Sequence, residues 1–374
     1  MRVLIAPDKF KGTLTAREAA EAIARGWHKA RPEDSLELLP ISDGGDGFGE
    51  VMGELLGAKQ QQIRTVDAAH RRCSATWWWD AKSKTAVVES ARVIGLAMLP
   101  KGKFHPFELD TFGLGAVLHA AQRDGAKQII VGIGGSATND GGFGMARALG
   151  WKFLNADRQE IEHWTHLDHL AEVHKPSSPL SPRITVAVDV QNPLLGLRGA
   201  SRVYGPQKGL RPEDFAKAER CLRRLATILK QQHDLDAARN PGAGAAGGLG
   251  FGLMVFSGAR FQSGFAMVEK HSQLRQKLKH ADVVITGEGA IDRTTAMGKG
   301  CGEVAGLCRT LRLPCFGLGG KVTPSHQVRK MFTRVSGLTE LTSTDQACRR
   351  PVFWLRRLAE KTASNLVCKL PLRR

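Results

Sequence analysis

The sequence lacks any apolar run long enough to cross a membrane. A spanning helix needs about 18 consecutive apolar residues, and no segment of this 374-residue chain approaches that length. The first residues, MRVLIAPDKF, enter a short apolar strand at once, without the longer apolar region and small-residue cleavage site of a secretory signal peptide. We therefore expect a cytoplasmic protein with no membrane partner.

The sequence also lacks paired cysteines. Its seven cysteines include no C-x-x-C pair, which argues against a zinc knuckle, and their odd number argues against a disulfide framework. Cys301, Cys308 and Cys315 recur at a spacing of seven residues, but Pro314 interrupts the pattern. We interpret the first two as neighbours on one helix face and the third as part of the next strand, all as reduced thiols without a chemical role.

Acidic residues are few. The chain has 36 Asp and Glu against 54 Lys and Arg, for a formal net charge of +18, and such an excess suggests a nucleic-acid or anionic-membrane partner. The basic residues, however, form only scattered pairs such as Arg71-Arg72, and no RNA-recognition or zinc-finger signature accompanies them. We expect no nucleic-acid partner, so the charge fits anionic small substrates or a basic surface without specific meaning.

Strand and helix patterns alternate at both ends of the chain. An apolar strand at 2–7 is followed by an amphipathic helix at 15–30, whose Thr15 and Glu18 form a Thr-x-x-Glu capping box, and by a second strand at 36–41. Elements of the same kind return as a strand at 281–286, a helix at about 300–312, a strand at 314–318 and a helix at 351–370. This alternation predicts an α/β protein with a largely parallel or mixed sheet.

The middle of the chain continues the alternation and adds a hairpin. The segment CSATWWW is predicted to pair with TAVVES across the turn DAKSK, so that its tryptophans pack in a strand and do not form a base-stacking surface. Further elements are a helix at 114–124, a strand at 128–133, a strand at 183–190 and a long helix at 212–232. The length of 374 residues favours two domains.

Glycine is abundant where the predicted strands end. Five segments combine glycine with one or two carboxylates: APDKFKGT (6–13), SDGGDG (42–47), GIGGSATNDGG (132–142), DVQNPLLG (189–196) and TGEGAID (286–292). Ligands of open α/β sheets bind at the carboxyl ends of the strands. Any one segment could be an ordinary turn, because Gly, Asp and Asn are common turn residues, but the recurrence of five favours a binding site.

These segments have the composition of a site for phosphoryl transfer. Glycine-rich turns present backbone N–H groups to phosphate, and glycine leaves room for close approach. A carboxylate beside them would repel that phosphate unless a cation lay between the two, which indicates Mg²⁺ with a nucleotide polyphosphate. Lysines in or near the segments could neutralise the transferred group; they are Lys9, Lys11, Lys208 and Lys299.

One segment also imitates a dinucleotide-binding fingerprint. GIGGSA (132–137) follows a predicted strand with the spacing G-x-G-x-x-A, and Asp157 lies 20 residues further on, so an NAD-dependent reductase is an alternative. The continuation TNDGGFG resists helix formation where a Rossmann helix should start. A second match, GAGAAG (242–247), follows no predicted strand, and no G-x-x-x-x-G-K-[ST] motif is present.

In this order the segments make the chain resemble the bacterial glycerate kinase family whose members begin with APDKFKG. Further matching segments are GPQKG (205–209), PGAGAAGGLG (241–250) and the stretch from ADVVITGEG to GKG (281–300). The resemblance implies ATP-dependent phosphorylation of D-glycerate. It also implies a flavodoxin-like domain formed by both chain ends, expected at 1–66 plus 281–374, with a second α/β domain inserted at 67–280.

The resemblance leads to a hypothesis for the site residues. The catalytic candidates are Asp189, Glu288, Lys9 and Lys11. ATP would lie along Gly134, Gly135, Ser136, Asn139, Gly287, Gly289 and Lys299. Glycerate would contact Asp8, Asp43, Gly44, Gly45, Asp46, Asn192 and Lys208. Mg²⁺ would be held by carboxylates among Asp140, Asp189, Glu288 and Asp292.

The chain departs from the family pattern near two of these sets. Where arginine usually follows Gly-Glu-Gly, this chain has Ala290, and Thr294-Thr295 replaces a glutamine-threonine pair. Asp46 and Phe48 stand where glutamate and threonine are common. Loss of an arginine could weaken anion binding, so a related hydroxy acid remains an alternative substrate. The predicted product is 2-phosphoglycerate, with 3-phosphoglycerate as the alternative, and a homo-oligomer stays an open possibility.

Overall fold

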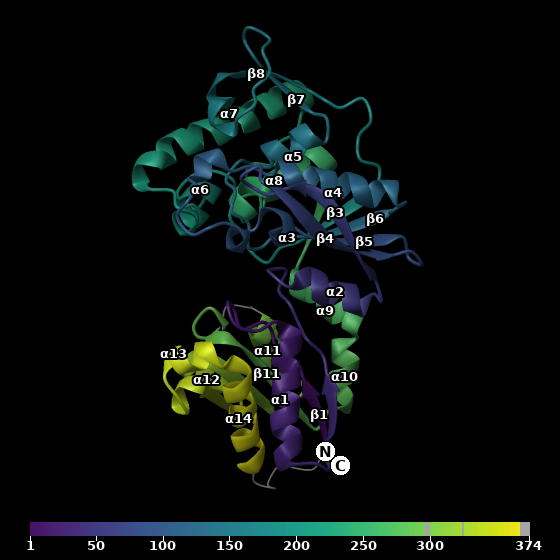
Figure 1. Cartoon of the computed structure of the whole chain (residues 1–374), viewed down its shortest axis with the longest axis vertical. Helices are drawn as coiled ribbons and strands as arrows, with labels where there is room; N and C mark the ends of the chain where they lie inside the picture. Colours follow the sequence, from purple (N-terminus) through teal and green to yellow (C-terminus); the bar gives the residue numbers. More distant parts are fainter. Residues whose placement is uncertain (296–299, 324, 367–374) are drawn as a thin grey trace. The chain divides into compact units, whose positions relative to one another are not determined.

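The computed structural model describes residues 1–295, 300–323 and 325–366. The chain divides into two compact units: unit 1 comprises Met1–Asp43 and Phe265–Arg374, and unit 2 comprises Gly44–Gly264. Figure 1 shows the elements of both units, coloured along the sequence. Unit 1 therefore contains segments from both ends of the chain.

Unit 1 contains one five-stranded sheet in which every neighbouring pair of strands is parallel. Its order is β2-β1-β11-β12-β13. The strands are β1 (Arg2–Ile5), β2 (Ser35–Leu38), β11 (Val283–Ile291), β12 (Cys315–Val322) and β13 (Arg334–Gly337). Counted along unit 1 alone, this is the order 2-1-3-4-5 of flavodoxin-like folds. The predicted α/β class with a flavodoxin-like sheet is confirmed.

Helices from both ends of the chain pack on this sheet. Besides α9 (Gly264–Ser272), which leads in from unit 2, the helices are α1 (Ala16–Ala30), α10 (Leu274–His280), α11 (Gly300–Thr310), α12 (His326–Met331), α13 (Thr344–Arg349) and α14 (Pro351–Ser364). Helices α1 and α14 lie side by side (Figure 1). A Cβ on Gly26 would lie only 2.1 Å from the Arg356 carbonyl oxygen. Their apolar sides share a buried cluster with Ile285 of β11, so the two ends of the chain form one core.

The N-terminus of α1 is fixed by its predicted capping box. The backbone N–H of Glu18 donates to Thr15 Oγ1 at 3.1 Å, and the Glu18 carboxylate accepts the Thr15 N–H at 2.8 Å. A capping box of this kind satisfies two N–H groups at the start of the helix, where intrahelical acceptors are lacking. The prediction at this position is confirmed.

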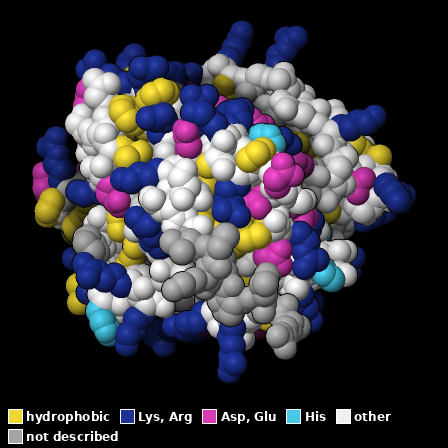
Figure 2. All heavy atoms as spheres, turned by 90° about the horizontal axis from the view of Figure 1, so that it is seen from below, with side chains coloured by type: hydrophobic (Ala, Val, Ile, Leu, Met, Phe, Trp, Pro, Cys, Tyr) yellow, Lys and Arg dark blue, Asp and Glu magenta, His cyan; other side chains and the backbone are white. Residues whose placement is uncertain are grey.

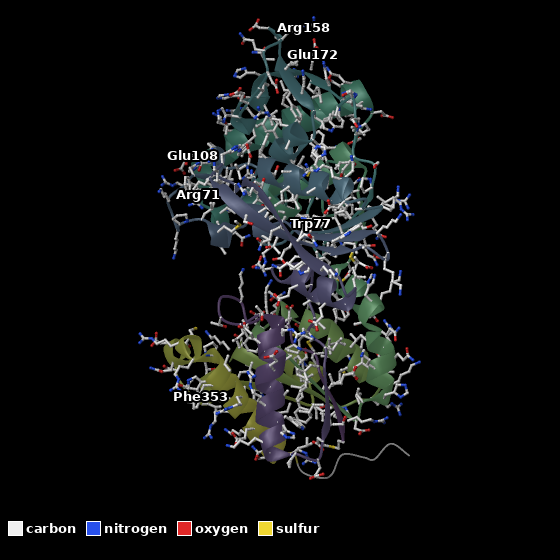
Figure 3. The ribbon with its side chains drawn as sticks, turned by 45° about the vertical axis from the view of Figure 1, so that its right-hand side comes forward. Arg71, Trp77, Glu108, Arg158, Glu172 and Phe353 are labelled. Atoms are coloured by element: carbon white, nitrogen blue, oxygen red, sulfur yellow. The ribbon has the colours of Figure 1, made fainter. Side chains whose placement is uncertain are left out.

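Unit 2 contains a six-stranded mixed sheet of order β10-β9-β6-β5-β4-β3. Its strands are β3 (Lys59–Val66), β4 (Arg72–Asp80), β5 (Thr85–Glu89), β6 (Gln128–Gly132), β9 (Arg183–Ala187) and β10 (Arg260–Gln262). The tryptophan hairpin is confirmed, because β4 pairs antiparallel with β5 and Trp77 lies opposite Val88; Figure 3 shows Trp77 on this sheet. Strands β5, β6, β9 and β10 run parallel, so their carboxyl ends lie along one edge.

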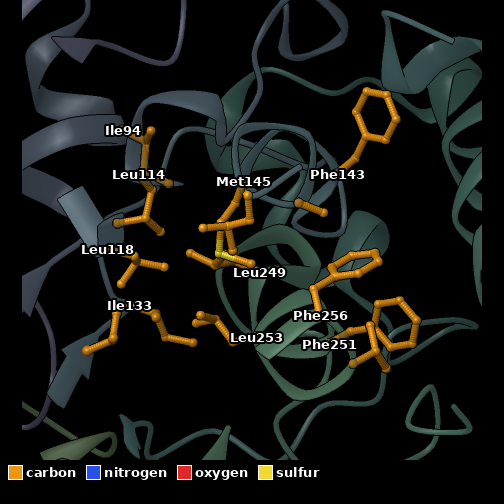
Figure 4. Close-up of a cluster of buried hydrophobic side chains, with 14 of the residues drawn as sticks. Ile94, Leu114, Leu118, Ile133, Phe143, Met145, Leu249, Phe251, Leu253 and Phe256 are labelled. Carbon is orange, nitrogen blue, oxygen red and sulfur yellow. The ribbon is translucent and has the colours of Figure 1, made fainter. Parts of the chain in front are cut away.

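Helices and a small second sheet surround the core of unit 2. The helices are α2 (Phe48–Leu55), α3 (Ala91–Ile94), α4 (Phe112–Arg123), α5 (Phe143–Ala148), α6 (Ala200–Tyr204), α7 (Phe215–His233) and α8 (Ala245–Ser257). The second sheet pairs β7 (Lys152–Asn155) with β8 (Leu170–His174). Buried side chains such as Leu118 of α4, Met145 of α5 and Phe251 of α8 pack together (Figure 4). This core supports the loops at the carboxyl ends of the parallel strands.

The boundaries between the units differ from those expected at 66/67 and 280/281. The first lies between Asp43 and Gly44, because α2 and β3 pack within unit 2: a Cβ on Gly49 of α2 would lie 2.1 Å from the Trp78 ring, and β3 pairs with β4 over its whole length. The second follows Gly264, because α10 contacts β1 of unit 1. Side-chain packing across the sequence, which no local pattern records, decides both positions.

The face of the molecule in Figure 2 carries its positive charge in a dispersed form. On the face that Figure 2 shows, Lys and Arg lie scattered among acidic and apolar side chains. Some take part in exposed ion pairs, such as Arg349 with Asp345 at 3.0 Å, and pairs of this kind contribute little to stability. In the described part of the chain, no helix combines the length and apolar character needed to span a bilayer.

Candidate active site

Three predicted carboxylates gather at the switch point of the sheet in unit 1. In the order 2-1-3-4-5, the direction of strand addition reverses between β1 and β11, and ligands of such folds bind at the carboxyl ends there. Asp8 follows β1, Asp43 follows β2, and Glu288 lies near the end of β11. The charges of Asp43 and Glu288 both raise the pKa of Asp8. The fold thus brings together residues that are far apart in the sequence.

Asp8 is a buried carboxyl, with 6% of its surface exposed. Its Oδ1 accepts the Lys9 backbone N–H at 2.7 Å, and a Cβ on Gly300, the first residue of α11, would lie 3.1 Å from its Oδ2. Burial, followed by the negative charge of Asp43, raises the pKa of Asp8 to about 8. A carboxyl of this kind can take up and release a proton near neutral pH.

Glu288 is held by the turn that follows β11. Thr295 Oγ1 donates to Glu288 Oε1 at 2.6 Å and accepts the Asp292 backbone N–H at 3.2 Å. Asp292 Oδ1 accepts the N–H and the hydroxyl of Thr294 at 2.6 and 2.7 Å. The Thr294-Thr295 pair, which departs from the family pattern, therefore fixes two of the predicted Mg²⁺ ligands, Glu288 and Asp292.

The glycines of this region have protein neighbours that leave no room for a side chain. A Cβ would lie 2.2 Å from the Leu318 carbonyl oxygen at Gly287 and 3.0 Å from the Lys11 backbone nitrogen at Gly289. Backbone packing accounts for both glycines, and their contact with ATP stays a prediction. The other predicted residues are Lys9, which is half-buried, Lys11 and Ala290, which are exposed, and Lys299, which lies outside the described residues.

In unit 2, residues 44–46 of SDGGDG pack directly against the start of GIGGSATNDGG. The Gly134 N–H donates to the Gly44 carbonyl at 3.3 Å, and a Cβ on Gly134 would lie 2.5 Å from Gly45 Cα. At Gly135, where φ is +76°, a Cβ would lie 1.8 Å from Asp46 Oδ1. On the Cβ side of these glycines the neighbouring loop of the same unit takes the space, and their predicted contact with ATP stays a prediction for the exposed side of the loop.

Replacing Gly135 by alanine is expected to destabilise unit 2. The new Cβ would lie 1.8 Å from Asp46 Oδ1, so the Asp46 side chain would have to move, and the alanine would stand at positive φ; together these should lower the free energy of unfolding by about 1–2 kcal/mol. Chemical denaturation followed by tryptophan fluorescence measures the loss. Gly57→Ala is the control, since φ there is also positive, at +63°, with nothing within 4 Å. Equal losses in the two variants would contradict the collision argument.

The loop after β6 stays non-helical where a dinucleotide-binding fold would begin its helix. Helix α5 starts only at Phe143, after the whole glycine-rich segment, and Gly142 has a φ of +80°. A Cβ on Gly142 would lie 2.8 Å from Gly252 Cα of α8, so this end of the loop is also packed against protein. The second fingerprint match, GAGAAG, leads into α8 from a turn. The local geometry gives no support to the NAD-dependent alternative.

Asp140, a predicted Mg²⁺ ligand, is fully buried and surrounded by donors. Its Oδ2 accepts the Thr111 N–H at 2.9 Å, the Thr111 hydroxyl at 2.7 Å and the Gly144 N–H at 2.9 Å. Its Oδ1 accepts the Gly142 N–H at 3.3 Å. Burial and the neighbouring Asp110 raise the pKa of Asp140 to about 6. These bonds tie the loop to the starts of α4 and α5, and they give no support to the predicted metal role.

Lys208 lies beneath the same loop. It is 7% exposed, and its Nζ donates to the Thr138 carbonyl at 2.6 Å. Burial lowers the pKa of Lys208 to about 7. The side chain of Asn139 is also buried: Nδ2 donates to Ser201 Oγ at 2.9 Å, whereas Oδ1 has no hydrogen-bond partner in the described ranges. Ser136 Oγ lies 2.9 Å from the Thr138 hydroxyl. The buried Lys208 amine, with a pKa of about 7, is thus hydrogen-bonded to the loop that is predicted to bind phosphate.

The loop after β9 carries two more predicted residues, which differ in their surroundings. Asp189 is exposed at the carboxyl edge of the sheet. Asn192 Oδ1 accepts the Tyr204 hydroxyl at 2.7 Å, and its Nδ2 donates to the Arg198 carbonyl at 2.8 Å. Both polar atoms of the Asn192 side chain are therefore bonded within the protein, and this geometry gives no support to the predicted contact with glycerate. Asp189, in contrast, is accessible to a ligand.

One residue at this edge was not predicted from the sequence. Glu89 ends β5 and is 2% exposed, and its two carboxylate oxygens accept the N–H groups of Gly47 and Gly49, each at 3.0 Å. The signal in the sequence is an acid at the end of an apolar strand. That signal does not reveal the partners, because they lie 42 and 40 residues earlier in the chain.

The carboxylates at these edges suit Mg²⁺ only with help from a substrate. Within residues 1–295, 300–323 and 325–366, no group of three or more His, Cys, Asp or Glu side chains could hold a metal ion. Mg²⁺ commonly takes one or two protein carboxylates and completes its shell with phosphate oxygens and water. Glu288 and Asp292, which are half-buried, and Asp189, which is exposed, fit that requirement as oxygen donors.

Known proteins resemble this chain over its whole length. The sequence model of the Glycerate kinase family matches residues 3–367. The glycerate 2-kinase of Escherichia coli (strain K12) is 35% identical over 378 residues, 98% of each chain. The glycerate kinase of Halalkalibacterium halodurans is 37% identical over 331 residues, 87% of each. A solved structure from Salmonella typhimurium LT2, of a candidate glycerate kinase 2, is 33% identical with a TM-score of 0.81 over 98% of each chain. Together with the two α/β units, these matches show that the chain is a kinase and belongs to the glycerate kinase family.

Proposed function

We propose that the protein transfers the γ-phosphoryl group of ATP to the 2-hydroxyl of D-glycerate, giving 2-phosphoglycerate and ADP. The proposal depends most on the grouping of Asp8, Asp43 and Glu288 at the switch point of a flavodoxin-like sheet, in a chain of this family. The choice of the 2-hydroxyl follows the name of the Escherichia coli relative. The proposed substrates are small molecules, the proposed location is the cytoplasm, and neither nucleic acid nor membrane is a proposed partner.

Glycerate is assigned to the residues at the ends of β1 and β2 and to residues 44–46 of the loop that follows, as predicted from the sequence. Lys9 and Lys11 supply positive charge for its carboxylate, and Asp8 and Asp43 accept hydrogen bonds from its hydroxyls. Asp8 is also suited to accept the proton of the attacking hydroxyl, because a general base works best when its pKa lies near the working pH, and the pKa of Asp8 is about 8. The role of Asp8 thus extends the binding role predicted from the sequence.

The phosphates of ATP are assigned to the loop of Gly134, Gly135 and Ser136. Phosphoryl transfer depends mainly on positioning and on stabilisation of charge, and backbone N–H groups at strand ends provide both. Gly135 is exposed and accessible to a phosphate. The hydrogen bond from Lys208 to the Thr138 carbonyl holds this loop in place.

Mg²⁺ is assigned to Glu288 and Asp292 of unit 1, whereas Asp189 of unit 2 keeps the catalytic role predicted from the sequence. When bound, it would neutralise charge on the phosphate oxygens. The chain itself positions these carboxylate oxygens. The Thr295 hydroxyl donates to Glu288, and the Thr294 hydroxyl donates to Asp292.

A coupled assay of ADP formation tests the proposal. ADP should form from ATP and Mg²⁺ only when D-glycerate is added, and ³¹P NMR should identify the product as 2-phosphoglycerate. Formation of 3-phosphoglycerate would overturn the regiochemistry. Turnover with another small hydroxy acid but not with glycerate would overturn the choice of substrate and would direct attention to Ala290, where the family usually has arginine.

The variant Asp189→Asn is expected to reduce kcat by about tenfold while leaving stability nearly unchanged. In a loose transition state the carboxylate mainly orients the nucleophile or the cation, and an exposed substitution usually changes the free energy of unfolding by less than about 0.5 kcal/mol. Steady-state kinetics and thermal unfolding measure the two effects. Asp157→Asn, at another exposed aspartate of unit 2, is the control. Near-normal turnover of Asp189→Asn would remove Asp189 from the catalytic set.

A further inference from the structure

We propose that Glu89 is a positioning residue for the glycerate-binding loop: its buried carboxylate holds the start of α2 and thereby places residues 44–46 against Gly134 and Gly135. This inference rests on the proposed function, since it concerns one loop of that same site. Neither the sequence motifs nor the names of the relatives assign a role to Glu89.

The carboxylate of Glu89 caps a helix that cannot cap itself. The first N–H groups of any helix lack intrahelical acceptors, and the N-cap residue of α2, Gly47, has no side chain to supply one. Glu89 accepts the N–H groups of Gly47 and Gly49 at 3.0 Å each. A negative charge at a helix N-terminus is also favoured by the helix dipole. Glu89 thus attaches the start of α2 to the carboxyl end of β5.

Arg92 pairs with two carboxylates on the solvent side, those of Glu89 and Glu50. Its Nε lies 3.6 Å from Glu89 Oε1, and its Nη2 lies 3.6 Å from Glu50 Oε2 of α2. The Arg92 side chain is 44% exposed, whereas that of Glu89 is 2% exposed. The inner carboxylate therefore makes the directional bonds, and the arginine connects it to the first turn of the helix by charge.

The rest of α2 packs closely on the ring of Trp78. A Cβ on Gly49 would lie 2.1 Å from Trp78 Cζ3, and a Cβ on Gly53 would lie 2.4 Å from Trp78 Cδ1. Two glycines thus let the helix rest on the Trp78 ring. Apolar contact of this kind is not directional, so the bonds from Glu89 supply the directional contacts at the first residues of the helix.

The position where α2 begins determines the position of the loop before it. The loop has little freedom, because a Cβ on Gly134 would lie 2.5 Å from Gly45 Cα and a Cβ on Gly135 would lie 1.8 Å from Asp46 Oδ1. If the start of α2 moved, Asp46 would have to move against Gly135. Loss of the Glu89 carboxylate should therefore act on the substrate that residues 44–46 bind.

Asp67 offers a matched control, because it is a buried carboxylate of the same unit with the same kind of partners. It is 3% exposed, accepts the N–H groups of Ala69 and Arg71 at 2.9 and 3.0 Å, and pairs with the Arg71 guanidinium at 2.7 Å. It belongs to the turn between β3 and β4 and to none of the proposed substrate sites. A merely structural role for Glu89 would make the two residues equivalent.

The test compares Glu89→Gln with Asp67→Asn in the full chain. A glutamine offers one carbonyl oxygen, so one of the two N–H groups at Gly47 and Gly49 loses its acceptor. We expect Glu89→Gln to raise the KM for glycerate about tenfold, with a smaller rise in the KM for ATP, because Asp46 contacts Gly135 of the loop assigned to its phosphates. Hydrogen exchange at the amides of Gly47 and Gly49 should accelerate. Asp67→Asn should lower the Tm but leave both KM values and these amides unchanged.

The outcomes separate the possibilities. Unchanged KM and kcat in Glu89→Gln, or an equal rise of the glycerate KM in Asp67→Asn, would overturn the positioning role. If Glu89→Gln does not fold, Arg92→Gln removes only the outer ion pair and should still raise the KM for glycerate a few-fold; no change there would also overturn it. If wild type fails to phosphorylate glycerate, the proposed function falls by itself, and the exchange rates of the Gly47 and Gly49 amides still decide whether Glu89 holds the loop.

Discussion

Replacing Asp8 by asparagine should lower kcat for glycerate by about a hundredfold or more and should at the same time make the folded chain more stable above neutral pH. Asparagine has nearly the shape of aspartate and can still accept the Lys9 N–H that Asp8 Oδ1 accepts at 2.7 Å. It cannot accept a proton from the attacking hydroxyl, a form of assistance that contributes about 10²–10⁴ in rate. Activity and stability are therefore expected to change in opposite directions.

The gain in stability follows from the pKa of Asp8. Burial and the charge of Asp43 raise this pKa to about 8 from the ordinary value of 3.8. Between those two values the folded chain binds more protons than the unfolded chain, so the free energy of unfolding of wild type falls as the pH rises through this window. Asparagine does not titrate. Asp8→Asn should therefore resemble wild type near the lower limit and become progressively more stable than wild type toward the upper one.

Thermal unfolding in EDTA across this window, together with steady-state kinetics, measures both effects. EDTA matters because a bound cation would lower the pKa of Asp8. The difference in Tm should increase with pH, by about 2–4 °C for each kcal/mol in a domain of about 150–250 residues. Asp345→Asn is the control, since that carboxylate is 65% exposed in a surface ion pair. A difference in Tm that does not depend on pH, or near-normal turnover, would contradict the assignment of Asp8.

Replacing Lys208 by methionine should also reduce kcat by about a hundredfold. Methionine has a similar length and is apolar, so it can fill the buried space, but the Thr138 carbonyl loses the donor that now lies at 2.6 Å. Thr138 belongs to the loop to which the phosphates of ATP are assigned. A displacement of reacting groups by about 1 Å can cost about a hundredfold in rate, so a small relaxation of this loop is sufficient.

The pH dependence of stability gives Lys208→Met a second signature. Burial lowers the pKa of Lys208 to about 7 from the ordinary value of 10.5. Between these values the unfolded chain binds more protons than the folded chain, so the free energy of unfolding of wild type increases with pH. Methionine cannot contribute this increase. The stability of Lys208→Met relative to wild type should therefore be greatest at or below the lower value and should decrease as the pH rises above it.

Urea denaturation at the two ends of this window measures the difference in slope, and kinetics at neutral pH measures the loss of activity. Lys230→Met is a suitable control, because Lys230 lies on α7, is 61% exposed and pairs with Asp236 at the surface. It should leave both the slope and kcat unchanged. The same slope in Lys208→Met and wild type would show that Lys208 keeps its ordinary pKa in the folded chain.

The regular elements whose apolar periodicity is strong could be predicted. Strand β1, helix α1 with its capping box, and the hairpin of β4 and β5 all follow from local patterns. Strand β3 was missed, because its sequence, KQQQIRTV, is mostly polar and the strand lies at the edge of its sheet. It is held by pairing with β4, and a pairing partner is not a property of the segment itself.

In the candidate site, too, local patterns could be predicted and long-range contacts could not. Asp8, Asp43 and Glu288, which come from three of the segments at strand ends, do gather at one switch point, and their role in binding stays a prediction. Individual roles were less predictable. Asp140 and Asn192 are residue types that often bind metals or substrates, yet their polar atoms are hydrogen-bonded to other groups of the protein. Whether a polar side chain finds hydrogen-bond partners within the protein depends on neighbours from elsewhere in the chain, and the sequence does not identify these neighbours.

By itself, the sequence determined the α/β class, the membership in a kinase family and the segments that carry the chemistry, because those features depend on local periodicity and on motifs that keep their order. Only the tertiary structure decided where the units divide, which glycines face protein, and which carboxyl and amine are buried. The physical reason is that burial and hydrogen bonding are set by contacts between distant segments. Glu89 with Gly47, and Asp8 with Glu288, are pairs that only the folded chain brings together.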